Sequence, residues 1–193
     1  GRVEALRDKQ LEDYEKTQKQ NKSQKESKIK NEISLIKKEL QKLKIKPDYK
    51  DNLDLIDNLK NLNKQLQKVK IEIIKKDKSK NIIKDNKIRN ILLRKQVLKD
   101  FPPKELRNIV DQAKKEIKSC IVICFSIFED KVGIAIGVSN DLTSKYDAVH
   151  LVKIASEILG GKGGGGRKDF AQAGGINSNK TDEAYSKILK KIS

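Results

Sequence analysis

Apolar residues recur in the first half of the chain at heptad spacing, which is typical of helices that pair along one face. The first such seam is Ile29, Ile33, Ile36, Leu40 and Leu43, and the second is Leu55, Leu59, Leu62, Leu66, Val69 and Ile73. Pro47 lies between the seams and breaks the helix. We therefore predict two helices that fold back as an antiparallel hairpin. The same seams could instead pair with a second copy of the chain.

The stretches around the two seams complete a predicted helical arm. Residues 15–28 contain no large apolar side chain, so a helix there is polar on all sides and bridges solvent. Ile71 and Ile74 widen the apolar stripe of the second helix beyond what one partner helix covers. Residues 77–100 place scattered apolar residues in a Lys- and Asn-rich setting, where we predict one or two short helices. Residues 1–100 are thus predicted to form a helical arm that could also mediate dimerisation.

The period of the apolar pattern changes after Pro102 and Pro103, which exclude a continuous helix and mark a domain boundary. The predicted order is then a helix over 103–118, strands over 119–128 and 131–139, a helix over 147–159, a strand over 170–175 and a helix from Thr181. Residues 101–193 therefore form a small domain. The predicted fold class is α+β: a long antiparallel, coiled-coil-like helical arm followed by a small α+β globular domain with a short sheet and a glycine-rich loop.

The most unusual stretch is GGKGGGGRKDFAQAGG, residues 160–175, in which eight of sixteen residues are glycine. Glycine lets the backbone adopt positive φ and lets another molecule approach closely. Three cations, Lys162, Arg167 and Lys168, punctuate this run. The pattern predicts a pliable loop whose exposed N–H groups and cations could cradle an anion.

The net charge of +17 also favours an anionic partner. The excess is uneven, because residues 1–100 carry a net +13 and residues 101–193 a net +4. Solvated helix faces tolerate lysine freely, however, so compositional drift explains the charge of the first half equally well. Hydrophobic residues make up 36% of the chain, which is too few for one large core spanning its whole length.

Several site chemistries are excluded by what the sequence lacks. Cys120 and Cys124 are two residues of one apolar run without a second Cys or His cluster, so we predict buried thiols on one strand face rather than a zinc site. His150 is the only histidine and lies in a predicted helix, and no Ser/His/Asp set can be assembled. The glycine run follows a helix rather than a strand, so it does not fit a nucleotide-binding loop. Asp169 is assigned to a salt bridge or a turn.

We therefore expect a chain that has no catalytic residues, metal or cofactor of its own. No signal peptide and no apolar run of membrane-spanning length occurs in the sequence, so a cytoplasmic protein without a membrane partner is expected. The chain also begins without an initiator Met, which we take to indicate a fragment of a longer protein.

The motif GGKGGGGRKDFAQAGG closely resembles the glycine-rich motif of the C-terminal domain of alanyl-tRNA synthetase. The order of the predicted elements agrees, and the opening RVEAL is similar to the segment after that enzyme's editing domain. The resemblance covers the whole chain and is strongest over 119–175. Lys168 stands where the family often has proline. The same fold occurs as the DHH-associated domain of phosphoesterases, which carry a histidine after the glycines, and none follows Gly166 here.

The resemblance implies the C-terminal part of an alanine–tRNA ligase, a family that uses ATP, Mg and Zn at sites absent from this chain. It implies binding of tRNA for alanine, assistance to aminoacylation and editing, and, in some members, dimerisation. The candidate RNA-binding residues are Lys162, Gly163, Gly164, Gly165, Gly166, Arg167, Lys168, Phe170 and Gln172. Phe170 could stack on a base or pack in the core. The alternative functions are a structural oligomerisation arm and the nucleotide-binding domain of a DHH-type phosphoesterase.

Overall fold

The computed structural model describes residues 2–193, with side chains from Gln10 onward, so the side chains of the opening RVEAL lie outside the described part. The chain divides into two compact units between Lys70 and Ile71. The predicted boundary after residue 100 differs from this division because residues 81–99 belong to the sheet of the second unit.

The first unit consists of helix α1 (Arg2–Lys42) and most of helix α2 (Leu55–Lys76). The two seams pack against each other within the chain, as predicted. The buried residues of this cluster are Ile33, Ile36, Leu40, Leu62 and Leu66. Residues 15–28 belong to α1 and are exposed on all sides, also as predicted. Ile73 is wrongly assigned to the second seam, because its side chain is 47% exposed whereas Ile74 is buried.

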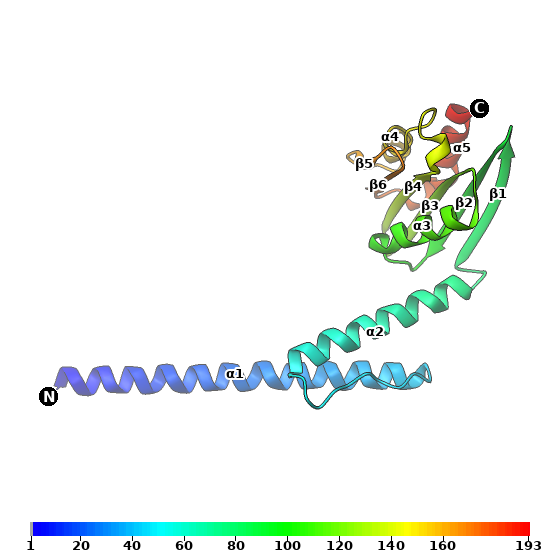
Figure 1. Cartoon of the computed structure of the whole chain (residues 1–193). Coiled ribbons are helices and arrows are strands. Elements are labelled where there is room, and N and C mark those ends of the chain that lie inside the picture. The colour runs from blue at the N-terminus through cyan, green and yellow to red at the C-terminus, as the bar shows by residue number, and fades with distance from the viewer. Residues whose placement is uncertain (1) are drawn as a thin grey trace. The chain divides into compact units, whose positions relative to one another are not determined.

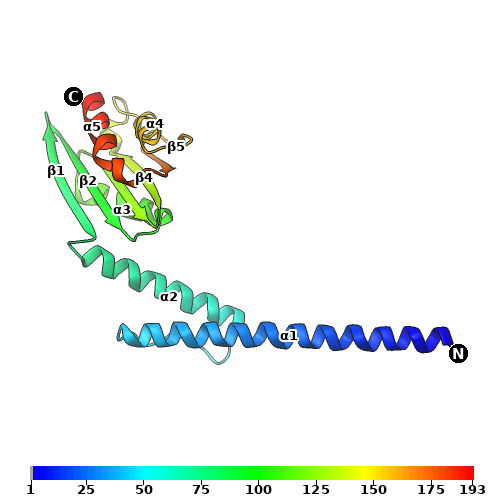
Figure 2. The same ribbon diagram turned by 180° about the vertical axis from the view of Figure 1, so that it is seen from behind.

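The two helices run in the same direction rather than antiparallel (Figures 1 and 2). An ion pair of 2.7 Å between Glu39 and Lys70 joins the C-terminal parts of both helices, which only a parallel arrangement allows. The connection between α1 and α2 is extended, and at about 3.3 Å per residue it is long enough to return along most of α2. Gln65 fixes it by accepting from the backbone of Asp48 and donating to that of Lys46.

The second unit contains a six-stranded sheet in the order β1-β2-β3-β4-β6-β5. Its strands are β1 (Asn81–Ile88), β2 (Ile91–Lys99), β3 (Cys120–Phe128), β4 (Lys131–Val138), β5 (Gly164–Arg167) and β6 (Phe170–Gly175). Neighbouring strands are antiparallel except β2 and β3, which are parallel and joined through the short 3-10 helix η1 (Pro103–Glu105) and helix α3 (Leu106–Glu116). Helices α4 (Ala148–Ile158) and α5 (Thr181–Ile192) complete the unit.

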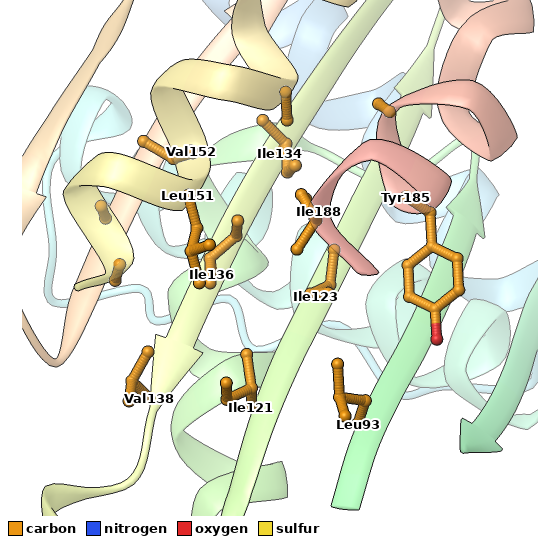
Figure 3. Close-up of a cluster of buried hydrophobic side chains, with 14 of the residues drawn as sticks. Leu93, Ile121, Ile123, Ile134, Ile136, Val138, Leu151, Val152, Tyr185 and Ile188 are labelled. Carbon is orange, nitrogen blue, oxygen red and sulfur yellow. The ribbon is translucent and has the colours of Figure 1, made fainter. Parts of the chain in front are cut away.

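Both faces of the sheet are covered, which explains why β3 is apolar throughout rather than alternating. Cys120, Val122 and Cys124 face the cluster under α3. Ile121 and Ile123 face the opposite cluster, under α4 and α5 (Figure 3). The two cysteines are therefore buried on one face, as the sequence predicts. The predicted helices over 103–118, 147–159 and from Thr181, and the predicted strands, are confirmed.

The helices predicted over 77–100 are wrong, because this region forms the hairpin β1–β2. Arg89, with a φ of 53°, makes the tight turn between the two strands. Lys95 and Gln96 are buried in the middle of β2 and interrupt the apolar alternation that marks a strand. Lys95 is buried against Asp182 and the ring of Tyr185, and Gln96 donates to Asn81. Such contacts lie outside the reach of a periodicity argument.

Candidate nucleic-acid interface

The glycine-rich stretch forms the hairpin β5–β6 at one edge of the sheet. Four residues of the predicted loop, Gly164–Arg167, are strand β5 and pair with β6, so the expectation of an irregular, pliable loop is wrong for them. The entry to the hairpin is also fixed, since the N–H of Gly161 donates to the carbonyl of Ser156 and that of Gly163 to its hydroxyl. Backbone pairing needs no side chains, so composition alone could not reveal this strand.

Three glycines of the stretch are required by the packing of the hairpin itself. A Cβ at Gly161 would lie 2.0 Å from the carbonyl oxygen of Gly174, and one at Gly164 would lie 2.7 Å from the carbonyl oxygen of Gln172. A Cβ at Gly166 would lie 2.3 Å from the carbonyl oxygen of Phe170, and its φ of 151° disfavours other residues. Much of the glycine bias is therefore explained by the fold alone.

Gly165 differs from these glycines. A Cβ built on it meets no atom within 4 Å, and its φ lies outside the left-handed region. Gly174 is similar, with only one ordinary contact, 3.8 Å from a backbone oxygen. Through their pairing with Gln172 and Gly133, both glycines lie on the α3 side of the sheet. Nothing in the described part of the chain requires glycine at either position.

We call the surface formed by Gly165, Gln172 and Gly174 the glycine face. An open cleft of about 510 Å³ adjoins this face: Gln172 and Gly174 line it together with Pro103 and Lys131, whereas Gly165 lies outside the lining. Gln172 is half-buried, and its amide lies 3.5 Å from the carbonyl oxygen of Pro103. Gln172 carries the one side chain among these three residues, so an approaching molecule can reach the backbone at Gly165 and Gly174 directly.

Three predicted cations flank the glycine face along the chain. Lys162 and Lys168 are exposed, and no ion pair occurs at either among the residues with described side chains. Arg167 is 70% exposed on its side chain and lies 3.2 Å from Asp169. The charges are therefore available at the surface, with Arg167 held in place by a neighbouring carboxylate.

Asp169 fixes the turn of the hairpin, which confirms its assignment to a salt bridge. Its carboxylate lies 3.7 Å from the ammonium of Lys114, and that ammonium also donates to the backbone carbonyl of Asp169 at 3.1 Å. Partial burial opposes ionisation, but the charges of Lys114 and Arg167 outweigh it and hold the pKa of Asp169 below its ordinary value. Asp169 therefore stays ionised and anchors the turn to α3.

Phe170 belongs to the core rather than to the surface. Its side chain is only 8% exposed and packs in the cluster under α3, which is the core-packing alternative. The guanidinium of Arg107 lies 5.0 Å from the centre of its ring. A buried ring offers no face to a base, so the stacking role considered for Phe170 is not supported. Arg107 and Lys114 were missed as neighbours of the hairpin, because only the topology brings α3 beside it.

Other potential chemistry is limited in the part of the chain with described side chains. No group of three or more His, Cys, Asp or Glu residues there could hold a metal ion. His150 is exposed on α4. Burial raises the pKa of the Cys124 thiol to about 12, which leaves it protonated and unreactive at neutral pH. Within the described residues, no helix combines the length and apolar composition needed to cross a bilayer.

Comparison with known proteins identifies the class of this domain. The model of the DHHA1 domain family matches residues 92–193, more than half of the chain. The chain therefore belongs to the DHHA1 domain family. The match begins within β2, before the predicted domain boundary at residue 101.

Within this class the similarity is to alanine–tRNA ligases. The chain is 49% identical over 92 residues to that of Parvibaculum lavamentivorans, covering 47% of this chain and 10% of the ligase. It is 51% identical over 85 residues to that of Hyphomonas neptunium, covering 44% of this chain and 10% of the ligase. The chain thus matches about a tenth of the length of these curated relatives.

A solved structure supports the same relationship. The C-Ala domain of alanyl-tRNA synthetase from Aquifex aeolicus superimposes with a TM-score of 0.53 at 35% identity, covering 56% of this chain and 96% of that domain. The resemblance to the C-terminal region of alanyl-tRNA synthetase, predicted from the glycine-rich motif, is confirmed. The α+β fold class with a helical arm is confirmed as well.

Proposed function

We propose that this chain is the tRNA-binding C-terminal part of a cytoplasmic alanine–tRNA ligase and that its partner is tRNA for alanine. In this role it assists aminoacylation and editing, while the residues that use ATP, Mg and Zn lie elsewhere in the ligase. The chain itself is proposed to be non-catalytic. Similarity to ligases at 49% and 51% identity supports this function better than it supports a phosphoesterase domain.

One observation carries the proposal: the fold leaves Gly165 bare without needing a glycine there. A glycine without an internal role is explained by an external molecule that approaches the backbone closely. The exposed cations Lys162, Arg167 and Lys168 are suited to the phosphates of such a molecule. A bare backbone strip flanked by cations fits a reader of RNA shape, which contacts phosphates and sugars rather than base edges.

The direct test is a titration of the chain with tRNA for alanine and with a second tRNA at several salt concentrations. Gly165→Val should weaken binding by about tenfold or more, because the added side chain separates the backbone from the RNA. It should leave the thermal unfolding midpoint unchanged, because its Cβ enters open space. Ser144→Val places the same side chain at another exposed site and serves as the matched control.

Arg167→Ala and Lys168→Ala test the flanking cations separately. Each should reduce the slope of log binding constant against log salt concentration by about one, which is the expectation for one lost phosphate contact. If Gly165→Val binds as tightly as the unchanged chain, the glycine face is not the interface. If the unchanged chain binds neither tRNA, the proposed function itself is wrong.

Dimerisation through the arm is a second candidate function. The two heptad seams already pack against each other within one chain, so a dimer would have to use other residues. Leu35 and Ile56 remain 66% and 52% exposed and are the apolar residues best suited to this. Sedimentation of the chain and of Leu35→Lys with Ile56→Lys should show a dimer that the double variant loses. A monomer in both cases eliminates this candidate.

A further inference from the structure

A second open cleft, of about 720 Å³, lies in the sheet domain beside the turn of the β5–β6 hairpin. We call it the α3 cleft, because the C-terminal half of α3 forms one wall. The residues after β4, Ser139, Asn140 and Asp141, also line it, and Asp169 lies where the cleft meets the hairpin. Its size is within the range of sites that hold small molecules or single units of a polymer.

The α3 wall is basic. Lys114, Lys115 and Lys118 line it, and Lys114 is engaged by Asp169. Lys115 and Lys118 are exposed, and no ion pair occurs at either among the residues with described side chains. A helix C-terminus favours a lysine in its last turn, which accounts for Lys115. It does not account for Lys118, which follows the helix.

The carboxylates that line the cleft already have partners within the chain. Asp111 lies 3.7 Å from Arg107, and Asp141 accepts a hydrogen bond from the hydroxyl of Ser119. That hydrogen bond holds the pKa of Asp141 below its ordinary value, so this carboxylate is ionised at neutral pH. The lining of the cleft therefore combines two ammonium groups, unpaired among the described side chains, with an ionised acceptor.

We propose that the α3 cleft binds one phosphate–ribose unit of the RNA strand that lies on the β5–β6 hairpin. Lys115 and Lys118 contact the phosphate, and the side chains of Asn140 and Asp141 accept hydrogen bonds from ribose hydroxyls. This inference rests on the proposed function and extends its surface from the hairpin to α3. Asp169 links the two parts, because it holds both the hairpin turn and Lys114.

The chemistry of the cleft favours RNA over other polyanions. A ribose 2′-hydroxyl is a donor that a carboxylate can bind, and it is what distinguishes RNA from DNA at a given site. The carboxylates of an acidic peptide are acceptors only and offer no such donor to Asp141. A cleft lined by both cations and hydrogen-bond acceptors is therefore matched to a sugar-phosphate backbone.

The first test replaces both cleft lysines in the full chain. Lys115→Gln with Lys118→Gln should weaken tRNA binding by about fivefold or more and reduce the salt dependence by about one, as for one lost phosphate contact. The matched control is Lys187→Gln with Lys190→Gln, an exposed pair three residues apart on α5, which packs on the other face of the sheet. Thermal unfolding should be unchanged in both, because all four side chains are exposed.

Equal weakening by the two lysine pairs would show a diffuse charge effect and overturn the proposal. The proposal for the α3 cleft is also overturned if Lys115→Gln with Lys118→Gln binds tRNA as tightly as the unchanged chain. The proposed function survives that result. If the unchanged chain binds no tRNA, the proposed function fails instead. A further outcome is that polyglutamate displaces tRNA as well as a short RNA does at the same concentration of charge. The site would then bind anions without selectivity, and the proposal would be overturned.

The second test addresses the ribose contact with a short single-stranded RNA and its DNA counterpart. The unchanged chain should prefer the RNA by several-fold, and Asp141→Ala should reduce that preference. Because Asp141 is exposed, its loss should not unfold the domain. An RNA-to-DNA ratio that is the same in both proteins would contradict the ribose contact.

Discussion

The helical arm buries apolar residues in one interface between two helices, whereas the sheet domain buries them on both faces of its sheet. In the arm, one seam on α1 meets one seam on α2 together with the returning connection, and the buried cluster is small. In the domain, the sheet is covered on both faces, so β3 and β4 contribute to two clusters at once. In the arm, the two helices can move closer together when a buried side chain is shortened or removed. In the sheet domain, layers on both faces of the sheet prevent such an adjustment.

The same two regions show that net charge does not locate a binding site. The arm unit, residues 1–70, carries a net +7, and its exposed lysines are spread along solvated helices. The sheet unit, residues 71–193, carries a similar net +10, but its topology gathers Lys114, Lys115 and Lys118 in one cleft. The arrangement of cations around a shaped surface is therefore more informative than their number.

The largest effect is expected where the domain is packed most tightly. A Cβ at Gly137 would lie 2.2 Å from a methyl group of Val110, in the layer between β4 and α3. Gly137→Val should therefore lower the free energy of unfolding by about 3 kcal/mol or more. Thermal unfolding measures this, with Gly165→Val as the control that adds the same side chain to open space. Similar losses for both variants would contradict the distinction between the two glycines.

A smaller loss is expected from the core of the arm. Leu62 is fully buried between the seams, and Leu→Ala substitutions in cores cost about 2–5 kcal/mol. Leu62→Ala should fall near the lower limit, because a two-helix layer can partly close the gap. Chemical denaturation monitored by circular dichroism at 222 nm tests this, with the half-exposed Ile56→Ala as control. Equal effects at both positions would mean that the two seams do not pack in solution.

Beside Gln65, one buried side-chain amide holds the returning connection between α1 and α2. Asn58 is fully buried, and its side chain bonds the backbone N–H and carbonyl of Lys50 and the carbonyl of Leu53. Asn58→Ala should cost about 1–3 kcal/mol, the range for leaving buried polar groups without partners. Faster hydrogen exchange at the amides of residues 46–54 measures the local part of this loss. Unchanged exchange there would show that other contacts hold the connection.

The smallest effect concerns the ion pair of Lys95 and Asp182, in which the lysine is buried and the carboxylate exposed. The hydrogen bond and charge of Lys95 hold the pKa of Asp182 below its ordinary value. Asp182→Asn should therefore cost only about 1 kcal/mol at neutral pH, because solvent screens the exposed carboxylate.

The pH dependence of this pair has a defined sign. A lowered folded-state pKa contributes stability that is fully present above the unfolded-state value and is lost as the pH falls through the folded-state value. The difference in unfolding free energy between the unchanged chain and Asp182→Asn should thus shrink below about pH 4. Unfolding curves between pH 2 and pH 7 test this, and a difference that grows on acidification would contradict it.

Much of the fold follows from patterns that individual residues carry. The heptad seams predicted α1 and α2, and continuous β-branched runs predicted β3 and β4, because burial on one or two faces dictates those periods. The glycine-rich motif predicted the alanyl-tRNA synthetase relationship and the exposed cations Lys162, Arg167 and Lys168. By contrast, β2 was missed because Lys95 and Gln96 are buried through partners distant in sequence.

What the sequence by itself determined is therefore the identity of most elements, the apolar faces they bury and the class of the protein. Tertiary structure alone decided the parallel course of α2, the strand β5 and the separation of required glycines from the bare Gly165. The physical reason is that periodicity records which face of an element is buried but not what covers it. Helix direction, strand pairing and the open surface of a glycine depend on which distant segments meet.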